Sequence, residues 1–453
     1  MSTAYALTKP AGGAVQVPAH ERVVLPNGIT LLILPSHDVP LVAFHAVFRG
    51  GPLADSTPGI ASLVAGLLEK GAGERNAFEF ADAVEGAGGN FSVVTGTEAL
   101  SISGQFLARD QSLMLELLAD ALMRPRFDAD EFETLRDRRI ELIKATKDSD
   151  PAEVIGTYGR AMLFGPHVYS KPSTGSEKSL ASITHQDVLD YYRAHIGADR
   201  LVLVFAGDVD VPALKRDVTK AFGAWREAAV AAAAVPEPRR VRGRRVLLVD
   251  SPESAQTYFW IGNVGVNKQY AEHAALDLVN TLYGGRFTSI LNTELRIKSG
   301  LSYSARAGFT RTTAAGEFAI RSFTDTENTG TALDLSIETL TRLKTVGVTM
   351  DMLDSARSYV LGQYPLNFET AADWAAALVE LEFYGLGADY IDDYAAKLRD
   401  VTLPVARSVI DHAFPNVEDL AIVLIGDAEK IRDVASRYGE VNEMALTQPT
   451  FTP

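Results

Sequence analysis

Arg296 and Tyr303 are the residues of this chain whose types and spacing are best suited to chemistry. They lie seven positions apart in the stretch GGRFTSILNTELRIKSGLSYS, residues 284–304. A guanidinium is a rigid fork of N–H donors and a phenol carries one O–H donor, so such a pair can bind the carbonyl oxygens of a peptide. A helix-terminal charge beside a core aromatic residue would leave the same pattern. Spacing by itself therefore does not separate binding from packing.

The surrounding residues predict a short helix followed by a strand. Apolar residues recur on one helix face, and Thr288 or Ser289 is available as the N-cap. These apolar residues are Phe287, Ile290, Leu291 and Leu295. From Leu301 to Phe309 apolar and polar residues alternate, which predicts a half-buried strand with Tyr303 on its apolar face. Arg296 would lie in the last helical turn, where the helix dipole favours a cation. The two side chains could then project into one space.

This segment resembles the signature of the pitrilysin, insulinase and mitochondrial processing peptidase family, the inverzincins. In that signature a Gly-rich turn leads to a helix ending in Arg and then to G-L-x-Y, which is matched here by Arg296, Gly300, Leu301 and Tyr303. GPHVYSKPSTGS, residues 165–176, is similar to the family's G-x-H-P-Y-G segment. The resemblance implies that Arg296 and Tyr303 bind the substrate's backbone carbonyls from the half of the molecule opposite the zinc.

The zinc motif of the family is altered in this chain. Inverzincins carry H-x-x-E-H on a helix, where two histidines bind zinc and the glutamate is the general base. The similar segment here is PGIASLVAGLLEKG, residues 58–71, with Ser62, Ala65 and Gly66 at the His, Glu and His positions. Ala and Gly have no coordinating side chain, and a lone hydroxyl is a poor zinc ligand. We therefore expect a degenerate metal site and no metal cofactor in this chain.

No other residues in the sequence replace the missing ligands. Among the 8 histidines, none has another one helical turn away. The position of the family's third ligand falls on Glu141 or on Ile143, depending on how the helix is counted, and a solvent-facing charge is the simpler interpretation of Glu141. The chain has no cysteine, which excludes disulfides, thiolate metal sites and thiol catalysis. Walker A, G-x-G-x-x-G and G-x-S-x-G motifs are absent.

Composition restricts the possible partners. A net charge of −15 argues against nucleic acid or an anionic membrane surface, because both need a basic face. The single basic run, residues 239–245, is better explained as a solvated strand or linker edge. No apolar run approaches the length of a membrane span, and the first residues lack the pattern of a signal peptide. We expect a cytoplasmic protein, or a periplasmic one if a signal peptide has been removed.

The chain repeats itself. LVLVFAGD, residues 201–208, and LAIVLIGD, residues 420–427, are each a buried strand that ends in Gly-Asp before a helix. Residues 228–240, low in complexity and rich in proline, predict a linker between an N-terminal domain, 1–227, and a C-terminal domain, 241–453. We expect an α+β fold of two similar halves, each a mostly antiparallel sheet covered by helices.

Retention of Arg296 and Tyr303 together with loss of the metal ligands favours one function. The chain is expected to be the non-catalytic, substrate-binding subunit of a heterodimeric zinc metallopeptidase, inactive alone. Its partners would be a homologous zinc-bearing subunit, which holds the zinc, and an unfolded peptide substrate. The alternative is a structural or interaction subunit that has the peptidase fold and no role in proteolysis, as in some respiratory-complex core subunits that resemble this family.

Overall fold

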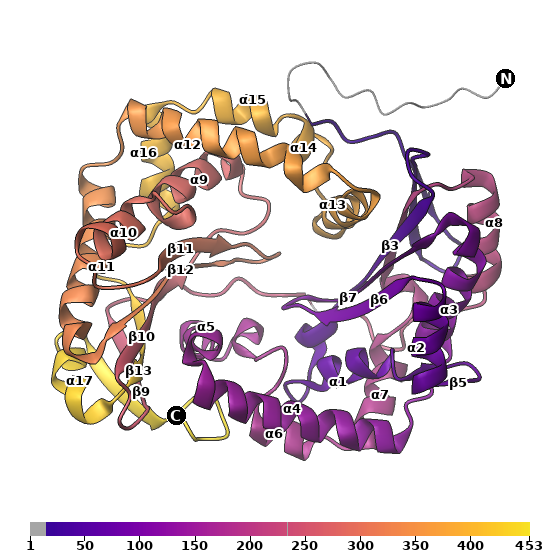
Figure 1. The fold of residues 1–453 in the computed structure, drawn as a ribbon, viewed down its shortest axis with the longest axis horizontal. Coiled ribbons are helices and arrows are strands. Elements are labelled where there is room, and N and C mark those ends of the chain that lie inside the picture. Colours follow the sequence, from indigo (N-terminus) through magenta and orange to yellow (C-terminus); the bar gives the residue numbers. More distant parts are fainter. Residues whose placement is uncertain (1–14, 233) are drawn as a thin grey trace. The chain divides into compact units, whose positions relative to one another are not determined.

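The computed structural model describes residues 15–232 and 234–453, which form two compact units (Figure 1). Each unit is assembled from three stretches of chain. The first unit consists of Met1–Glu141, Ser173–Ala234 and Tyr364–Asp392, and the second of Leu142–Pro172, Val235–Gln363 and Asp393–Pro453. The units therefore do not follow the two halves of the sequence, since each half contributes a segment to the other half's unit. The expected linker, residues 228–240, has no helix or strand in its described part.

The first unit is built on a six-stranded sheet in the order β1-β2-β8-β3-β7-β6. Neighbouring strands are antiparallel, except that β2 and β8 run parallel. The strands are β1 (Glu21–Val24), β2 (Thr30–Pro35), β3 (Leu41–Arg49), β6 (Asn90–Thr95), β7 (Ala99–Leu107) and β8 (Leu201–Gly207). Every residue of β8 is buried, as its continuous apolar sequence predicts. A small ribbon, β4 (Gly71–Ala72) with β5 (Arg75–Asn76), lies apart from this sheet.

Helix α13 (Ala371–Tyr384) packs on this sheet although it comes from the far half of the sequence (Figure 1). Its Trp374 and Leu378 share a buried apolar cluster with Val202 and Val204 of β8. The other helices of this unit are α1 (Ile60–Leu67), α2 (Ala77–Gly86), α3 (Gln111–Met123), α6 (Glu177–Ser182), α7 (His185–His195), α8 (Val211–Phe222) and α14 (Asp389–Asp392). Helix α4 (Ala129–Ser149) begins in the first unit and ends in the second.

The second unit repeats the plan with the strand order β11-β12-β10-β13-β9-β14. Here β9 runs parallel to both β13 and β14, and the remaining neighbours are antiparallel. The strands are β9 (Arg245–Asp250), β10 (Gln256–Val264), β11 (Ala305–Thr310), β12 (Glu317–Asp325), β13 (Ala421–Gly426) and β14 (Glu440–Ala445). The mixed fold of two mostly antiparallel sheets with helices, expected from the sequence, is confirmed.

Helix α5 (Pro151–Phe164) packs on β10 and β13, although it precedes the expected linker. Its Gly159 lies so close to the indole of Trp260 that a Cβ there would be 2.6 Å from the ring. The other helices of this unit are α9 (His273–Asn280), α10 (Ile290–Asn292), α11 (Thr329–Thr345), α12 (Met350–Gln363), α15 (Tyr394–Arg399), α16 (Leu403–Ala413) and α17 (Ala428–Ser436). The glycines of the repeated Gly-Asp pairs are the last residues of β8 and β13, and a helix follows each pair, as predicted.

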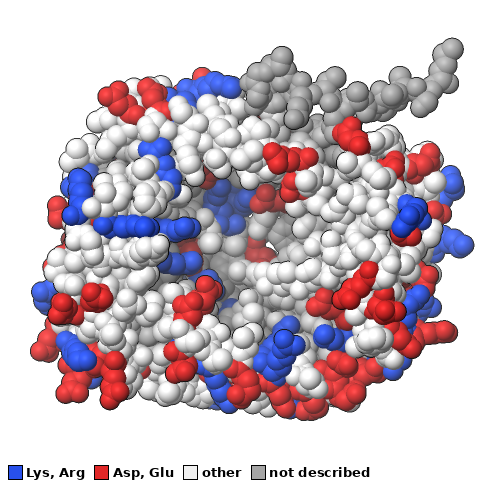
Figure 2. Space-filling model, in the orientation of Figure 1, with Lys and Arg blue, Asp and Glu red and all other residues white. Residues whose placement is uncertain are grey.

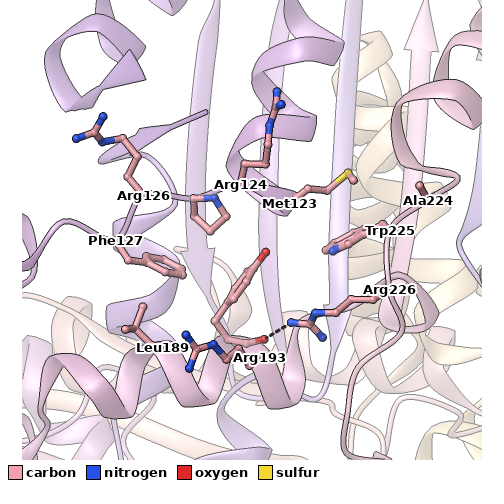
Figure 3. Close-up of a pocket in the computed structure, with 11 residues that line it drawn as sticks. Met123, Arg124, Arg126, Phe127, Leu189, Arg193, Ala224, Trp225 and Arg226 are labelled. Atoms are coloured by element: carbon pink, nitrogen blue, oxygen red, sulfur yellow. Dashed lines mark hydrogen bonds between the residues drawn. The ribbon is translucent and has the colours of Figure 1, made fainter. Parts of the chain in front are cut away.

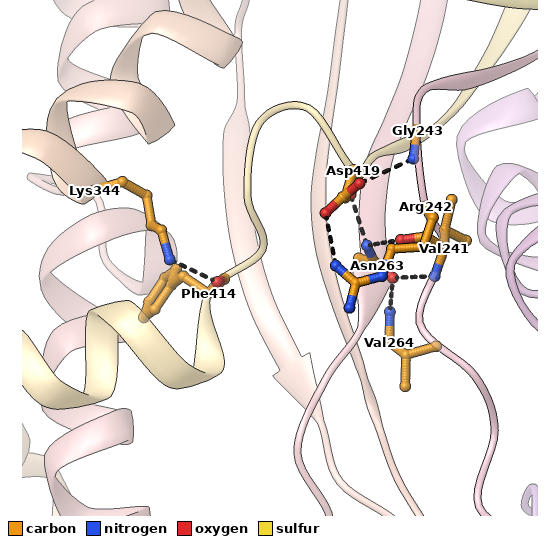
Figure 4. A network of polar contacts seen from close by, with 8 residues as sticks. All are labelled: Val241, Arg242, Gly243, Asn263, Val264, Lys344, Phe414 and Asp419. Carbon is orange, nitrogen blue, oxygen red and sulfur yellow. Dashed lines mark hydrogen bonds and ion pairs between the residues drawn. The ribbon is translucent and has the colours of Figure 1, made fainter.

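The chain enters β9 through a polar network that includes the basic run (Figure 4). Buried Asn263 accepts a hydrogen bond from the backbone N–H of Val241 at 3.0 Å and donates one to the carbonyl of Asp419 at 2.6 Å. Asp419 also pairs with the exposed Arg242 at 3.3 Å. Acidic and basic side chains are interspersed over the face seen in Figure 2. No helix in the described residues is long and apolar enough to cross a membrane.

Candidate functional site

Ser62, Ala65 and Gly66 lie together on α1, and all three are buried. The helix starts after Gly59, which has a φ of 100° and therefore favours glycine. Asp55 accepts hydrogen bonds from the N–H groups of Gly59 at 3.0 Å and Ala61 at 3.2 Å, which satisfies donors at the start of the helix. The spacing of the three residues thus places them on about one turn of a well-anchored helix.

Arg139 of α4 lies against this turn. Its Nη1 donates a hydrogen bond to Oγ of Ser62, and a Cβ added to Gly66 would come within 2.6 Å of its Nη2. Burial lowers the pKa of Arg139 to about 10, and the nearby carboxylate of Glu69 opposes this shift. The guanidinium is still charged at neutral pH. It therefore places a positive charge beside α1, in the space that a side chain at residue 66 would need.

A zinc ion does not fit these residues. A guanidinium has no lone pair to give to a metal, and its charge repels a cation. Glu141 is exposed on α4, and Ile143 is an apolar residue of the same helix. Within residues 15–232 and 234–453, no group of three or more His, Cys, Asp or Glu side chains could hold a metal ion.

Sequence reasoning missed Arg139. On α4 it follows Phe132 and Leu135 at the spacing of one helix face, and Phe132 is fully buried. The sequence signal that could have revealed Arg139 was a charged residue on the apolar face of a helix. Such a residue needs a compensating partner, which here is the hydroxyl of Ser62 together with the carboxylate of Glu69.

The predicted helix before Tyr303 exists in part. Ser289 caps α10, accepting a hydrogen bond from the N–H of Asn292 at 3.3 Å, and a π-helical segment, Thr293–Lys298, continues it and carries Arg296. Leu291 and Leu295 are buried as expected. The placement of Phe287 on the apolar face was wrong, because its side chain is 60% exposed. The helix begins only after Ser289, so Phe287 lies outside the helical repeat.

The predicted strand position of Tyr303 was also wrong. β11 begins at Ala305, and Tyr303 precedes it with 72% of its surface exposed. Ser302 turns inward in its place, since its hydroxyl donates to the carbonyl of Ser304 at 2.9 Å and accepts from Ser322 Oγ at 2.9 Å. Because the hydrogen bonds satisfy this buried serine, its neighbour Tyr303 points to the surface.

Two glycines of the Gly-rich signature are required by the backbone. Gly300 ends the helical segment with a φ of 68°, a conformation that side chains disfavour. A Cβ on Gly284 would lie 2.5 Å from the backbone nitrogen of Ala307 in β11, so only glycine lets this segment pack on the strand. These contacts fix the positions of the helical segment and the strand on either side of the pair.

The structure brings Arg296 and Tyr303 together. The Cζ of Arg296 lies 4.2 Å from the centroid of the Tyr303 ring and 4.9 Å from that of the Phe287 ring. Cation–π contacts of this kind orient a guanidinium without using its N–H groups. In the part of the chain that the structure describes, neither the guanidinium of Arg296 nor the hydroxyl of Tyr303 makes a hydrogen bond to the protein. Both groups are available as donors to a ligand.

Comparison with family models gives two matches. Residues 43–159, which include α1, all of α4 and most of α5, match a model described as "Insulinase (Peptidase family M16)". Residues 182–360, which include Arg296 and Tyr303, match one described as "Peptidase M16 inactive domain".

Individual proteins give the same result. An uncharacterized zinc protease of Mycobacterium tuberculosis is 25% identical over 401 residues, covering 87% of this chain and 90% of the relative. A "Non-peptidase homolog YmxG" of Helicobacter pylori is 23% identical over 401 residues, covering 87% and 91%. Among solved structures, a peptidase M16 inactive domain from Pseudomonas fluorescens has a TM-score of 0.84 at 23% identity, covering 90% of this chain and 98% of the other. A protease from Helicobacter pylori has a TM-score of 0.81 at 19% identity, covering 90% and 99%.

Proposed function

Because this chain belongs to the insulinase (M16) family of peptidases and is a non-catalytic member of it, we propose that it is the substrate-binding subunit of a heterodimeric zinc peptidase. A homologous partner chain would hold the zinc and the general base. This chain would contribute Arg296 and Tyr303 to the shared active site. Peptide cleavage would then require both chains.

The observation that carries the proposal is the state of the Arg296–Tyr303 pair. Both side chains are held in contact at 4.2 Å, Tyr303 is largely exposed, and their donors are unused by the described protein. An exposed aromatic ring under a guanidinium does not stabilise a core. Two preorganised donors at a surface are suited to the carbonyl oxygens of a peptide.

The strand that follows the pair supports an extended peptide as substrate. β11 is at one end of the strand order of its sheet, so one of its edges has no neighbouring strand in the described sheet. An unstructured peptide can add to such an edge through backbone hydrogen bonds. Tyr303 precedes the first residue of β11 by two positions, so a peptide bound there would pass close to its hydroxyl. Unfolded segments are therefore the proposed substrate class.

The proposal is tested by reconstitution with the zinc-bearing homologue of the same organism. We expect a one-to-one complex in light scattering, peptide cleavage by the complex, and none by either chain alone. The double variant Arg296→Ala/Tyr303→Phe should form the same complex with the same zinc content and lose most of the activity.

Arg286 and Tyr359 provide a matched control. They form another arginine–tyrosine contact in the same unit, at 6.0 Å, and Tyr359 is 45% exposed. The variant Arg286→Ala/Tyr359→Phe should retain full activity. Unchanged activity of the Arg296/Tyr303 double variant in a stable complex would contradict the substrate-binding role and favour the structural subunit. Separate chains at micromolar concentrations would contradict the heterodimer.

A further inference from the structure

The first unit contains a hollow of roughly 460 Å³ (Figure 3). Three segments of this unit line the hollow, and none of them belongs to α1. These are the end of α3 with the loop after it, residues 123–127, one face of α7, and residues 224–226 after α8. A volume of this size is in the range of small-molecule sites. All three segments belong to the same compact unit, so the hollow does not depend on the rest of the chain.

Four arginines line this hollow and no acidic residue does, in a chain of net charge −15. Three of them pair with carboxylates that do not themselves line the hollow. Arg124 pairs with Asp120 at 3.1 Å, Arg126 with Asp128 at 2.7 Å, and Arg193 with Asp190 at 3.3 Å. The carboxylate of Asp120 is buried, whereas the pairs of Arg126 and Arg193 are at least partly exposed. Exposed ion pairs contribute little to stability, so a phosphate group can compete for these two arginines at small loss.

Arg226 differs from the other three. It is exposed, and in the described residues it has no carboxylate partner. Its guanidinium donates to the backbone carbonyls of Glu227 at 3.1 Å and Tyr192 at 3.3 Å, and it lies 5.7 Å from the Tyr192 ring centroid. Two of its five N–H donors are therefore used. The others remain for an anion.

Aromatic side chains form the apolar part of the hollow. Phe127 and Tyr192 contact each other edge to face at 5.1 Å, and Trp225 lies beside Arg226 in the chain. Tyr192 is fixed by donating its hydroxyl proton to the carbonyl of Leu122 at 2.6 Å. Burial raises the pKa of this hydroxyl to about 12, so it remains a neutral donor at neutral pH.

The backbone of the lining loop is strained. Phe127 has a φ of 49°, an unusual value for a bulky residue. His185 holds this conformation, with its Nε2 2.6 Å from the carbonyl oxygen of Phe127. Strain of this kind is often kept where a side chain must be presented to a ligand.

We propose that this hollow is a binding site for a small phosphate-bearing aromatic molecule of the nucleoside phosphate class. The N–H donors of the guanidinium groups match the oxygens of a phosphate. A carboxylate has fewer oxygens and carries less charge than a phosphate. The base would stack at Tyr192 or at the guanidinium of Arg226, since both present a planar face. This site lies on different residues from the proposed peptide site and is tested without the partner chain.

Calorimetry on the full chain with ADP, adenosine and inorganic phosphate as separate probes tests the proposal. We expect saturable binding of ADP, tighter than that of either fragment, and weaker at high salt because the attraction is screened. Arg226→Ala should weaken ADP binding by about tenfold or more, as expected for the loss of a charge-assisted contact. Arg226→Lys should restore only part of it, because lysine lacks the planar fork.

Arg109→Ala is the matched control. Arg109 is 79% exposed in the same unit, pairs with Asp110, and does not line the hollow. Its loss removes the same charge and should leave ADP binding unchanged. No saturable ADP binding at millimolar concentration would overturn the proposal. Equal affinity for ADP and inorganic phosphate, equal affinity for ADP and adenosine, or normal binding by Arg226→Ala would also overturn it.

Discussion

Arg139 donates a hydrogen bond to the hydroxyl of Ser62, and its guanidinium occupies the space that a side chain at residue 66 would need. A partly buried cation therefore lies where the resemblance to the family would place two imidazoles and a metal ion. Ser62, Ala65 and Gly66 stand where the resemblance to the family expects the ligands and the base, and the charge of Arg139 beside them opposes a metal cation. The misfit between these residues and a zinc ion therefore involves two helices, α1 and α4.

The first prediction concerns recovery of metal. The unmodified chain should hold no stoichiometric zinc, and Ser62→His/Ala65→Glu/Gly66→His should not recover it, because the charge of Arg139 repels the cation. Adding Arg139→Glu removes the obstacle and offers a carboxylate, so this fourfold variant should bind zinc measured by elemental analysis after dialysis. Arg138→Glu, on the exposed side of α4, is the control and should not help. Equal zinc in the triple and fourfold variants would refute the role given to Arg139.

The second prediction separates the roles of Arg296 and Tyr303 in the reconstituted complex. A donor to the oxygen that becomes negative in the transition state contributes about 2.7–4 kcal/mol, or roughly a hundred- to a thousandfold in kcat. We expect Tyr303→Phe to lower kcat by this factor. Arg296→Ala should mainly raise KM, because it removes binding to the ground state as well. Tyr359→Phe should change neither constant. Loss of thermal stability in place of these kinetic effects would indicate a structural role.

The third prediction concerns the packing of α5 against β10 in the second unit. Gly159→Ala would place a Cβ 2.6 Å from the Trp260 ring and should destabilise the protein by about 1–3 kcal/mol through overpacking. Gly156→Ala, one turn earlier, would meet the ends of the flexible Arg321 and Arg160 side chains, the nearer at 3.4 Å. It should be neutral or stabilise by up to about 1 kcal/mol, since alanine is the better helix former. The free energy of unfolding of both variants can be measured with urea. Equal changes in the two variants would contradict this packing.

The fourth prediction concerns Glu317, a carboxylate only 1% exposed on β12. Burial raises its pKa above 4.5, against the opposing charges of Arg160 at 4.0 Å and Arg321 at 2.9 Å. A raised folded pKa contributes stability that is fully present below 4.5 and is lost as pH rises through the raised value.

Glu317→Gln removes this titration while keeping the shape of the side chain. The free energy of unfolding of the variant, relative to the unmodified protein, should therefore increase as pH rises from 4.5 through that window. Parallel stability curves for Glu317→Gln and the unmodified protein would contradict the raised pKa.

The sequence by itself determined the features that depend on local pattern. The two Gly-Asp pairs predicted the repeated strand and helix, because a buried parallel strand is a short continuous apolar run. Ser62, Ala65 and Gly66 predicted a degenerate metal site, because coordination requires particular side chains at particular helical spacing, and this is still a prediction. The Arg296–Tyr303 match also came from sequence, and the role proposed for the pair is still a prediction.

Only the tertiary structure decided which segments pack together and which way single side chains point. The exchange of α5 and α13 between the units leaves no local signal, since an apolar helix face does not specify the sheet it covers. Ser302 points inward because Ser322, on another strand, completes its hydrogen bonds. Its neighbour Tyr303 is therefore exposed, although the alternation of apolar and polar residues predicted that Tyr303 would be buried. Arg139 reaches Ser62 across 77 residues of chain. In each case the conformation is decided by the free energy of a contact between residues far apart in the sequence. A local sequence pattern carries no information about such a contact.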